Sequence, residues 1–578
     1  MFESQFSKLN RLFNKSEFSK FEEEFFNYDK NKLLCEKSYN LFGIYLQKKE
    51  NYLDAAKYFQ LAIASNPKFV EAKTNLAFIQ IKYTKDLDIA KQLLLDVIGQ
   101  DNNNKNANFL LAEIFFIQEQ YEDCIKICEI LTNTHPLFAT NYVRLGIAYL
   151  KINKSDKAIL NFRKSIQLDP NNYQNYYNLF LAYKKISNVQ ECISILQKLI
   201  KKFPQDKKAY SELSNLYRGI GNFKESDELL EKMLKIFGMK EADTIYQLLS
   251  SPKYENQDDL VITIEKNILD QNNDFRERVG YGLFKYYDRK KNFEVASEYL
   301  KKSLQLSSSR LNYNFDYEKQ QFQFLQKTFD NNFFKQRGFL VNTQKYSNIF
   351  IVGLHRSGST LLEQIISTNQ QFVSLGEITI FPDLITKYFP DQQLERFQTA
   401  IFNTPKKIFS KIGEEYQKKI NSGSVISIDK QLLNFRMIGF ILASLPNALI
   451  IHIKRNRNDN LFSMLSNYYA NDHAPWSYDP DVLSAYYEEY RNLMNHWNMI
   501  CPEKIINIQY EELVSNPKNE ISKILNKLKF EWNEDYLNFQ SNENIVQTQS
   551  VFQVRENLNS SSIDRWTHYK SHFPNFFK

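Results

Sequence analysis

The chain has 578 residues, of which 43% are hydrophobic and 24% are charged, and its formal net charge is +7 at pH 7. This length exceeds what one hydrophobic core supports, so two or more domains are expected. The composition is that of a soluble globular protein, and a mild positive charge without a long basic tract argues against a nucleic-acid partner.

Apolar residues never form a continuous run long enough to cross a membrane, and the N-terminus lacks the apolar segment of a signal peptide. The five cysteines form no CxxC pair, so we expect free thiols in a reducing compartment and no metal site. The sequence therefore predicts a cytoplasmic protein without a membrane span.

The first half of the chain is periodic. Pro136, Pro170 and Pro204 stand 34 residues apart, and each separates two apolar helical patterns. Between them the segment 142–149, rich in tyrosine and small residues, is followed by a second helical pattern at 156–162. This register resembles the tetratricopeptide repeat, whose helix–turn–helix units stack into a superhelix.

We predict four regions from these patterns. The repeat array occupies residues 38–308, with degenerate last units, after an N-terminal helical segment over 1–37. A helical junction follows over 309–347, and a separate domain occupies 348–578. The concave face of such an array commonly binds a peptide or a partner protein.

The second half alternates short apolar strands with helices. Strands are expected at 348–353, 424–428, 448–453 and 504–508. Continuous apolar strands separated by helices predict a parallel sheet covered on both faces, so the fold class is α + α/β. In such sheets ligands bind beyond the carboxyl ends of the strands.

A glycine-containing loop follows the first of these strands. Gly353 begins the sequence Gly-Leu-His-Arg-Ser-Gly-Ser-Thr, which has nearly the spacing of a nucleotide P-loop. The P-loop lysine is replaced by Ser359, and a cation lies inside the loop at Arg356. The free N–H groups where the next helix starts can bind an oxyanion. The loop therefore predicts a nucleotide ligand but argues against a kinase or NTPase.

A second cationic motif follows the strand at 448–453. Arg455 comes directly after this strand, and Ser463 lies eight residues later on an expected helix. Together they are suited to hold a second phosphate.

These motifs resemble those of sulfotransferases that use 3′-phosphoadenosine 5′-phosphosulfate (PAPS), and more closely proteins that join tetratricopeptide repeats to a tyrosylprotein-sulfotransferase-like domain. The likeness implies a P-loop-NTPase-like sheet and PAPS as co-substrate, with no metal. It also implies that the 5′-phosphosulfate is bound by Arg356, Ser357, Gly358, Ser359 and Thr360, and the 3′-phosphate by Arg455 and Ser463. Tyr510, in Tyr-Glu-Glu-Leu-Val, corresponds to a tyrosine that lies against the nucleotide.

The same resemblance implies the catalytic residues. Glu377 lies 21 residues after Arg356, at the position of the general base, and Lys430 corresponds to a lysine near the transferring group. Arg356 would be the third catalytic residue, beside Glu377 and Lys430. His355, where the family commonly has proline, is an alternative base. Glu556 replaces a cofactor-binding lysine, so Arg555 is a candidate substitute.

The expected function is sulfuryl transfer from PAPS to an acceptor hydroxyl, with a protein or peptide tyrosine presented by the repeats as the first candidate acceptor. Two alternatives stay open: a glycan or small-molecule sulfotransferase, and a repeat scaffold with an inactive nucleotide-binding domain.

Overall fold

The computed structural model describes residues 2–311, 313–339, 345–420, 423, 425–541, 551–552 and 562–577. They divide into two compact units, Met1–Pro204 and Gln205–Lys578, and each unit is described by itself. Within the described residues no helix is long and apolar enough to cross a membrane. All five cysteines are free thiols.

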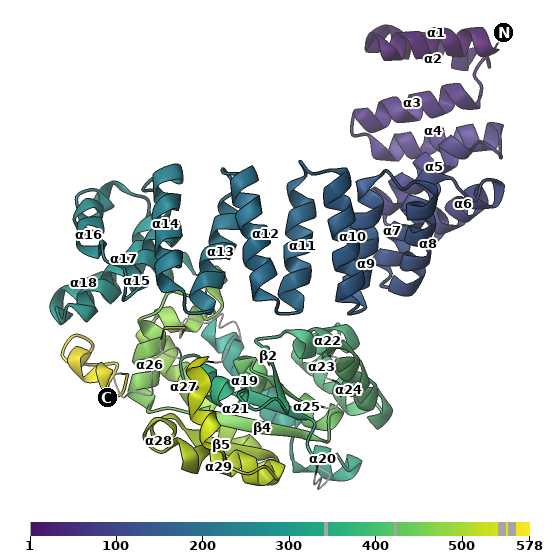
Figure 1. The fold of residues 1–578 in the computed structure, drawn as a ribbon. Coiled ribbons are helices and arrows are strands. Elements are labelled where there is room, and N and C mark those ends of the chain that lie inside the picture. Colours follow the sequence, from purple (N-terminus) through teal and green to yellow (C-terminus); the bar gives the residue numbers. More distant parts are fainter. Residues whose placement is uncertain are drawn as a thin grey trace. The chain divides into compact units, whose positions relative to one another are not determined.

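The first unit consists of helices that follow one another as antiparallel pairs (Figure 1). They are α1 (Phe2–Asn14), α2 (Phe18–Lys30), α3 (Glu36–Lys48), α4 (Tyr52–Ser65), α5 (Val70–Ile79), α6 (Leu87–Gln100), α7 (Lys105–Ile117), α8 (Tyr121–Thr134), α9 (Ala139–Lys151), α10 (Ser155–Leu168), α11 (Tyr173–Lys185) and α12 (Val189–Lys202).

Two of the pairs, α3–α4 and α9–α10, pack around a glycine of their first helix. A Cβ added at Gly43 of α3 would come within 2.5 Å of the Phe59 ring on α4. A Cβ at Gly146 of α9 would come within 2.6 Å of Phe162 on α10. Both glycines let a phenylalanine of the second helix reach the backbone of the first, so the same packing recurs along the array.

The second unit begins with further helices of the array and continues through the predicted junction. These are α13 (Lys207–Gly219), α14 (Phe223–Phe237), α15 (Ala242–Ser250), α16 (Gln257–Glu265), α17 (Asn273–Arg289), α18 (Phe293–Arg310), α19 (Phe315–Thr328) and α20 (Asn331–Arg337).

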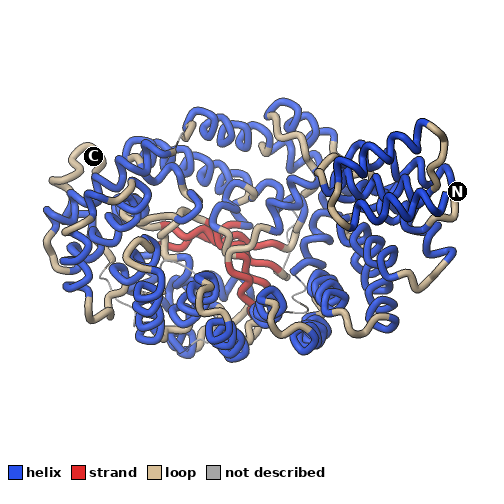
Figure 2. Tube along the Cα trace, turned by 90° about the horizontal axis from the view of Figure 1, so that it is seen from above, coloured by secondary structure: helices blue, strands red, loops and turns tan. Residues whose placement is uncertain are grey.

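A parallel sheet with the strand order β2-β3-β1-β4-β5 follows. Helices surround the strands in Figure 2. The elements are β1 (Asn348–Val352), α21 (Ser359–Ile366), β2 (Phe372–Gly376), α22 (Ile380–Tyr388), α23 (Leu394–Asn403), α24 (Lys406–Ile420), β3 (Ile426–Asp429), α25 (Ile438–Ser444), β4 (Ala448–Lys454), α26 (Arg457–Leu465), α27 (Pro480–Ile500), β5 (Ile505–Gln509), α28 (Tyr510–Ser515) and α29 (Pro517–Leu528).

Alternating side chains of the central strands form two cores. Phe350 of β1 and Ile450 of β4 belong to one apolar cluster, while Ile351 and Ile451 belong to the other. This alternation follows from the two-residue period of a strand. The sheet is therefore covered on both faces, as predicted, and the fold is α + α/β.

The structure adds a strand that the sequence patterns did not predict. β2 pairs with β3 and lies at an edge of the sheet, where most of its side chains are partly exposed. Its sequence, Phe-Val-Ser-Leu-Gly, lacks the continuous apolar run of a central strand because an edge strand is less completely covered.

The first core also extends into the last repeat helices. It contains Tyr281 and Phe284 of α17 and Leu300 of α18, together with Phe322 and Phe329 of the junction. A Cβ at Gly439 of α25 would come within 2.4 Å of the Phe329 ring. The last repeats, the junction and the sheet domain thus share one hydrophobic core within the second unit.

Candidate active site

The loop between β1 and α21 is built around Gly358. This glycine has φ +98°, a left-handed conformation, and α21 begins at the next residue. A Cβ here would come within 2.2 Å of the Tyr510 ring, so only glycine allows this tyrosine to lie against the loop. Two predicted nucleotide-binding residues are thereby in contact.

The hydroxyl-bearing residues of the loop are buried. Ser357, Ser359 and Thr360 are each at most 5% exposed. The Oγ of Ser357 has no hydrogen-bond partner among the described residues. A buried hydroxyl without a partner is costly unless a ligand satisfies it, so this loop is suited to an oxyanion.

The second cationic motif contacts the loop directly. Arg455 Nη1 donates to the backbone oxygen of Arg356 at 3.0 Å, and its guanidinium lies 4.8 Å from the centre of the Tyr510 ring. Arg356 Nε donates to Ser463 Oγ at 3.3 Å. The predicted donor loop, Arg455, Ser463 and Tyr510 therefore form one cluster. Arg555 lies outside the described residues.

Helix α26 begins at an asparagine cap that directly follows Arg455. The Asn456 side chain accepts hydrogen bonds from the backbone N–H groups of Asn458 and Asp459. Such a cap fixes the start of a helix and the direction of its first turn. Asn460, in that turn, donates to the backbone oxygen of His355 at 2.8 Å, which the sequence did not indicate.

A buried lysine and two carboxylates lie beyond β3. Lys430 is 1% exposed, and its Nζ lies 2.7 Å from Glu377 Oε1 and 3.6 Å from Glu363 Oε2. Burial works to lower the pKa of Lys430, but the two carboxylates outweigh it and raise that pKa. Lys430 is therefore charged at neutral pH. The Glu377 side chain is 47% exposed and reaches solvent.

Glu363 is a site residue that the sequence analysis missed. It lies on α21, is almost fully buried, and accepts a hydrogen bond from Ser374 at 2.6 Å. Burial raises its pKa. An acidic residue inside an otherwise apolar stretch, Leu361-Leu362-Glu363-Gln364-Ile365, is the signal that could have revealed it.

His355 lies near the same ion pair. Burial lowers the pKa of His355 to about 4, while the charge of Glu377 works in the opposite direction. Its ring lies 5.7 Å from that of Tyr469 and 6.2 Å from that of Trp476. His355 is therefore neutral at pH 7 and within electrostatic range of Glu377.

Asp429, directly before Lys430, is fully buried. Its Oδ2 accepts from the Tyr416 hydroxyl at 3.0 Å, and its Oδ1 accepts from the backbone N–H of Gln431 at 3.0 Å. Burial raises the pKa of Asp429 to about 7. These hydrogen bonds fix the turn that carries Lys430 toward Glu377.

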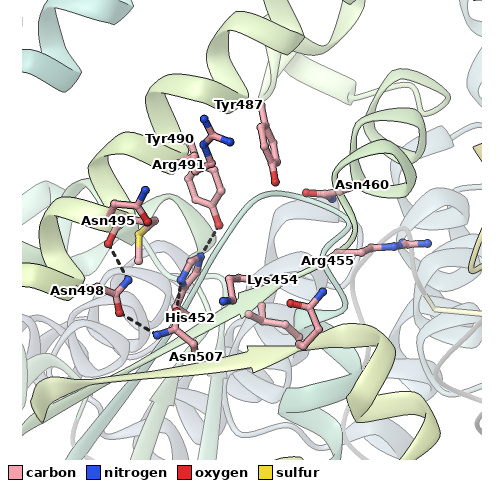
Figure 3. A pocket seen from close by; sticks show the side chains of 13 residues that line it. His452, Lys454, Arg455, Asn460, Tyr487, Tyr490, Arg491, Asn495, Asn498 and Asn507 are labelled. Atoms are coloured by element: carbon pink, nitrogen blue, oxygen red, sulfur yellow. Dashed lines mark hydrogen bonds between the residues drawn. The ribbon is translucent and has the colours of Figure 1, made fainter. Parts of the chain in front are cut away.

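A cavity of about 440 Å³ opens beside Arg455, between β4, β5 and α27 (Figure 3). His452 bridges Tyr490 and Asn507 in its wall, with distances of 2.6 and 2.8 Å. In Figure 3 the guanidinium of Arg455 points away from His452. The described lining residues include amides and cations but no carboxylate.

Comparison with known proteins identifies the families that this chain resembles. A model described as the sulfotransferase family matches residues 348–534, and tetratricopeptide-repeat models match residues 139–172 and 176–206. An uncharacterized protein of Aquifex aeolicus (strain VF5) is 26% identical over 313 residues, which cover 51% of this chain and 40% of that protein. The chain thus matches less than half the length of that relative.

Among solved structures, MamA from Desulfovibrio magneticus RS-1 is 16% identical, with a TM-score of 0.28, over 30% of this chain and 97% of that one. A thermophilic TPR protein of Thermus thermophilus is 18% identical, with a TM-score of 0.26, over 32% of this chain and 98% of that one. The family matches show that the chain joins tetratricopeptide repeats to a domain of the sulfotransferase family.

Proposed function

We propose that this protein transfers a sulfuryl group from PAPS to an acceptor hydroxyl. The observation that carries the proposal is the contact between two motifs 99 residues apart, Arg455 Nη1 to the backbone oxygen of Arg356 at 3.0 Å. This contact joins the proposed 5′-phosphosulfate loop to the proposed 3′-phosphate residues. One nucleotide with phosphates at both positions would span them.

The nucleotide would be held by groups that favour oxyanions. Backbone N–H groups of residues 357–360 and the side chains of Arg356, Ser357 and Thr360 would hold the 5′-phosphosulfate. Arg455 and Ser463 would hold the 3′-phosphate. Ser357 Oγ and Arg455 Nε, both buried and without a partner among the described residues, support this fit, because each can donate to a phosphate oxygen.

The transfer step breaks the bond between sulfur and the bridging oxygen of the phosphosulfate. The acceptor oxygen forms the new S–O bond, and the bridging electron pair stays on the 5′-phosphate. The acceptor proton passes to Glu377, whose exposed carboxylate can reach an incoming hydroxyl. Lys430 would stabilise the charge that develops on the leaving oxygen.

His355 is the second candidate for the base. Its Nδ1 has no hydrogen-bond partner among the described residues, and its ring is neutral at pH 7 because burial lowers its pKa to about 4. A base with so low a pKa accepts a proton weakly, so basicity gives His355 no clear advantage over a carboxylate. Glu377 is favoured by its solvent access, and its ion pair with Lys430 holds it beside the residue proposed to act on the leaving oxygen.

A peptide or protein is the acceptor that the repeats support best. Stacked tetratricopeptide repeats form extended surfaces that commonly bind peptides. We therefore propose a peptide tyrosine hydroxyl as the acceptor, ahead of a glycan or a small molecule.

Nucleotide binding tests the proposal first. By calorimetry, the protein should bind adenosine 3′,5′-bisphosphate far more tightly than ATP or adenosine 5′-phosphate. Equal or preferential binding of ATP would refute the proposal.

Glu377→Gln then tests the base. It should leave the affinity for the bisphosphate nearly unchanged while turnover falls by about 10²–10⁴-fold with labelled PAPS and an acceptor from cell lysate. His355→Gln is the matched variant. Full turnover in Glu377→Gln, with loss in His355→Gln, would assign the base to His355 instead.

A further inference from the structure

Residues 562–569, called here the C-terminal segment, contact the proposed 3′-phosphate site. The backbone oxygen of Ser562 accepts a hydrogen bond from Arg455 Nη2, and the Ser562 hydroxyl lies 2.8 Å from the Tyr510 hydroxyl. Arg455 Nη1 donates to the backbone oxygen of Arg356. Two backbone oxygens therefore fix the plane of the Arg455 guanidinium, while its Nε has no partner among the described residues.

The C-terminal segment is anchored on a repeat helix. Asp288 lies in the last turn of α17, and its side chain is 13% exposed. Arg565 Nη2 donates to Asp288 Oδ2 at 2.6 Å, and the Tyr569 hydroxyl donates to Asp288 Oδ1 at 2.5 Å. A carboxylate in the last turn of a helix opposes the helix dipole, and these two donors compensate for that cost. Asp288 thus holds both ends of the short 3₁₀ helix Arg565–Tyr569.

Ring packing and one backbone hydrogen bond complete this anchor. The ring of Tyr569, which is fully buried, lies 4.4 Å from that of Phe462 in α26 and 5.8 Å from that of Phe284 in α17. The backbone N–H of Asp564 donates to Asp459 Oδ2 at 2.8 Å, and Asp459 belongs to the first turn of α26. The C-terminal segment therefore contacts both a repeat helix and helix α26 of the proposed 3′-phosphate site.

We infer that Asp288, a residue of a repeat helix, positions Arg455 for the 3′-phosphate by anchoring the C-terminal segment. The inference rests on the proposed function and extends it, because the last repeat helices thereby take part in nucleotide recognition. Asp288 acts through Arg565 and Tyr569, so it is a positioning residue and not a catalytic one.

The link from Asp288 to the phosphate site is short. Ser562 precedes Arg565 by three residues, which span at most about 10 Å of extended chain. A shift of Arg565 is therefore passed to the backbone oxygen that holds Arg455. Charge-assisted hydrogen bonds from a guanidinium to a phosphate depend on the orientation of its fixed fork, so a tilted Arg455 would bind the 3′-phosphate less well.

The test compares two nucleotides that differ only in the 3′-phosphate. In the full-length protein, Asp288→Asn should weaken binding of adenosine 3′,5′-bisphosphate by about tenfold in calorimetry, the scale for losing one charge-assisted hydrogen bond. Binding of adenosine 5′-phosphate should stay nearly unchanged, because it lacks the group that Arg455 is proposed to bind. Asp274→Asn is the matched control, since Asp274 lies on the same helix but pairs with Arg278 at 2.7 Å. It should alter neither affinity.

Tyr569→Phe provides a second variant that keeps the buried ring. It removes one of the two hydrogen bonds to Asp288, so it should weaken bisphosphate binding in the same direction but by a smaller factor. The double variant Asp288→Asn/Tyr569→Phe should bind little more weakly than Asp288→Asn alone, because both changes act on one contact. Thermal unfolding checks that each variant folds, and Tyr569→Phe decides the case if Asp288→Asn does not fold.

Equal weakening of both nucleotides, no weakening of either, or additive losses in the double variant would overturn the role of Asp288. Failure of the wild-type protein to prefer the bisphosphate would instead refute the proposed function itself.

Discussion

The Tyr510 ring lies so close to Gly358 that a Cβ on the glycine would be 2.2 Å from the ring. Tyr510 begins α28 directly after β5, whereas Gly358 precedes α21 after β1. The contact therefore joins two loops at the carboxyl ends of separate strands, which is where parallel α/β sheets bind ligands.

Gly358→Ala should abolish nucleotide binding and destabilise the second unit by about 2–4 kcal/mol, because it adds a clash to the cost of a left-handed residue. Gly238→Ala is the control, since Gly238 has φ +88° and nothing within 4 Å of the added Cβ. Gly238→Ala should therefore lose only the free energy that a left-handed alanine costs, without a steric clash. Chemical denaturation and calorimetry measure both effects. Equal destabilisation by the two variants would show that Tyr510 is not tightly packed there.

Lys430→Met should lower the turnover number by about 10²–10³-fold while changing nucleotide affinity little, because the lysine is proposed to act on charge that develops during transfer. Lys504→Met provides a matched change at another buried lysine, whose Nζ donates to the Pro446 oxygen. Steady-state kinetics separate the two effects. A rise in KM with an unchanged turnover number would assign Lys430 to binding instead.

Asp429→Asn should change how stability depends on pH. Burial raises the pKa of Asp429 from 3.8 to about 7, so the unfolded chain loses this proton at lower pH than the folded protein does. The wild-type protein therefore loses stability from this group as pH rises from 4 to 7, by up to about 4 kcal/mol. Asparagine does not ionise, so unfolding midpoints of the variant relative to wild type should rise over that range. A difference that is constant with pH would contradict the prediction.

Arg310→Met should destabilise the contact between α18 and the segment after α26. Arg310 Nη2 lies 2.9 Å from Glu277 Oε1, and Arg310 Nη1 lies 2.8 Å from Asp472 Oδ2. Glu277 is 2% exposed, and removing its cation should cost about 2–3 kcal/mol, less than for a fully buried pair because Arg310 is partly exposed. Adding Glu277→Gln should recover part of the loss in a double-mutant cycle. Additive losses would show that the two residues act independently.

Much of the architecture could be predicted because its signals are local. The proline spacing predicts the repeats, and the apolar runs of β1 and β4 predict central strands. β2 was missed because an edge strand shows no continuous apolar run. The degeneracy of the last predicted repeat units has a physical cause as well, since Tyr281 and Leu300 pack into the core of the sheet domain.

The candidate site was predictable where its residues belong to motifs. Arg356, Arg455, Ser463 and Tyr510 were all predicted, and they lie together. Residues brought in by tertiary packing have no such signal. Asn460 is one asparagine among many in this sequence, and only its hydrogen bond to the backbone oxygen of His355 distinguishes it.

The shared core of the second unit also constrains how this gene could be divided or rearranged. Tyr281, Phe284 and Leu300 lie among the residues that bury the sheet, so a recombinant fragment that starts at β1 would expose that apolar surface to water. A fragment that starts at Gln205 keeps the whole core. For the same reason, we expect that loss or duplication of a repeat near Tyr281 would disrupt the core that the last repeats share with the sheet domain.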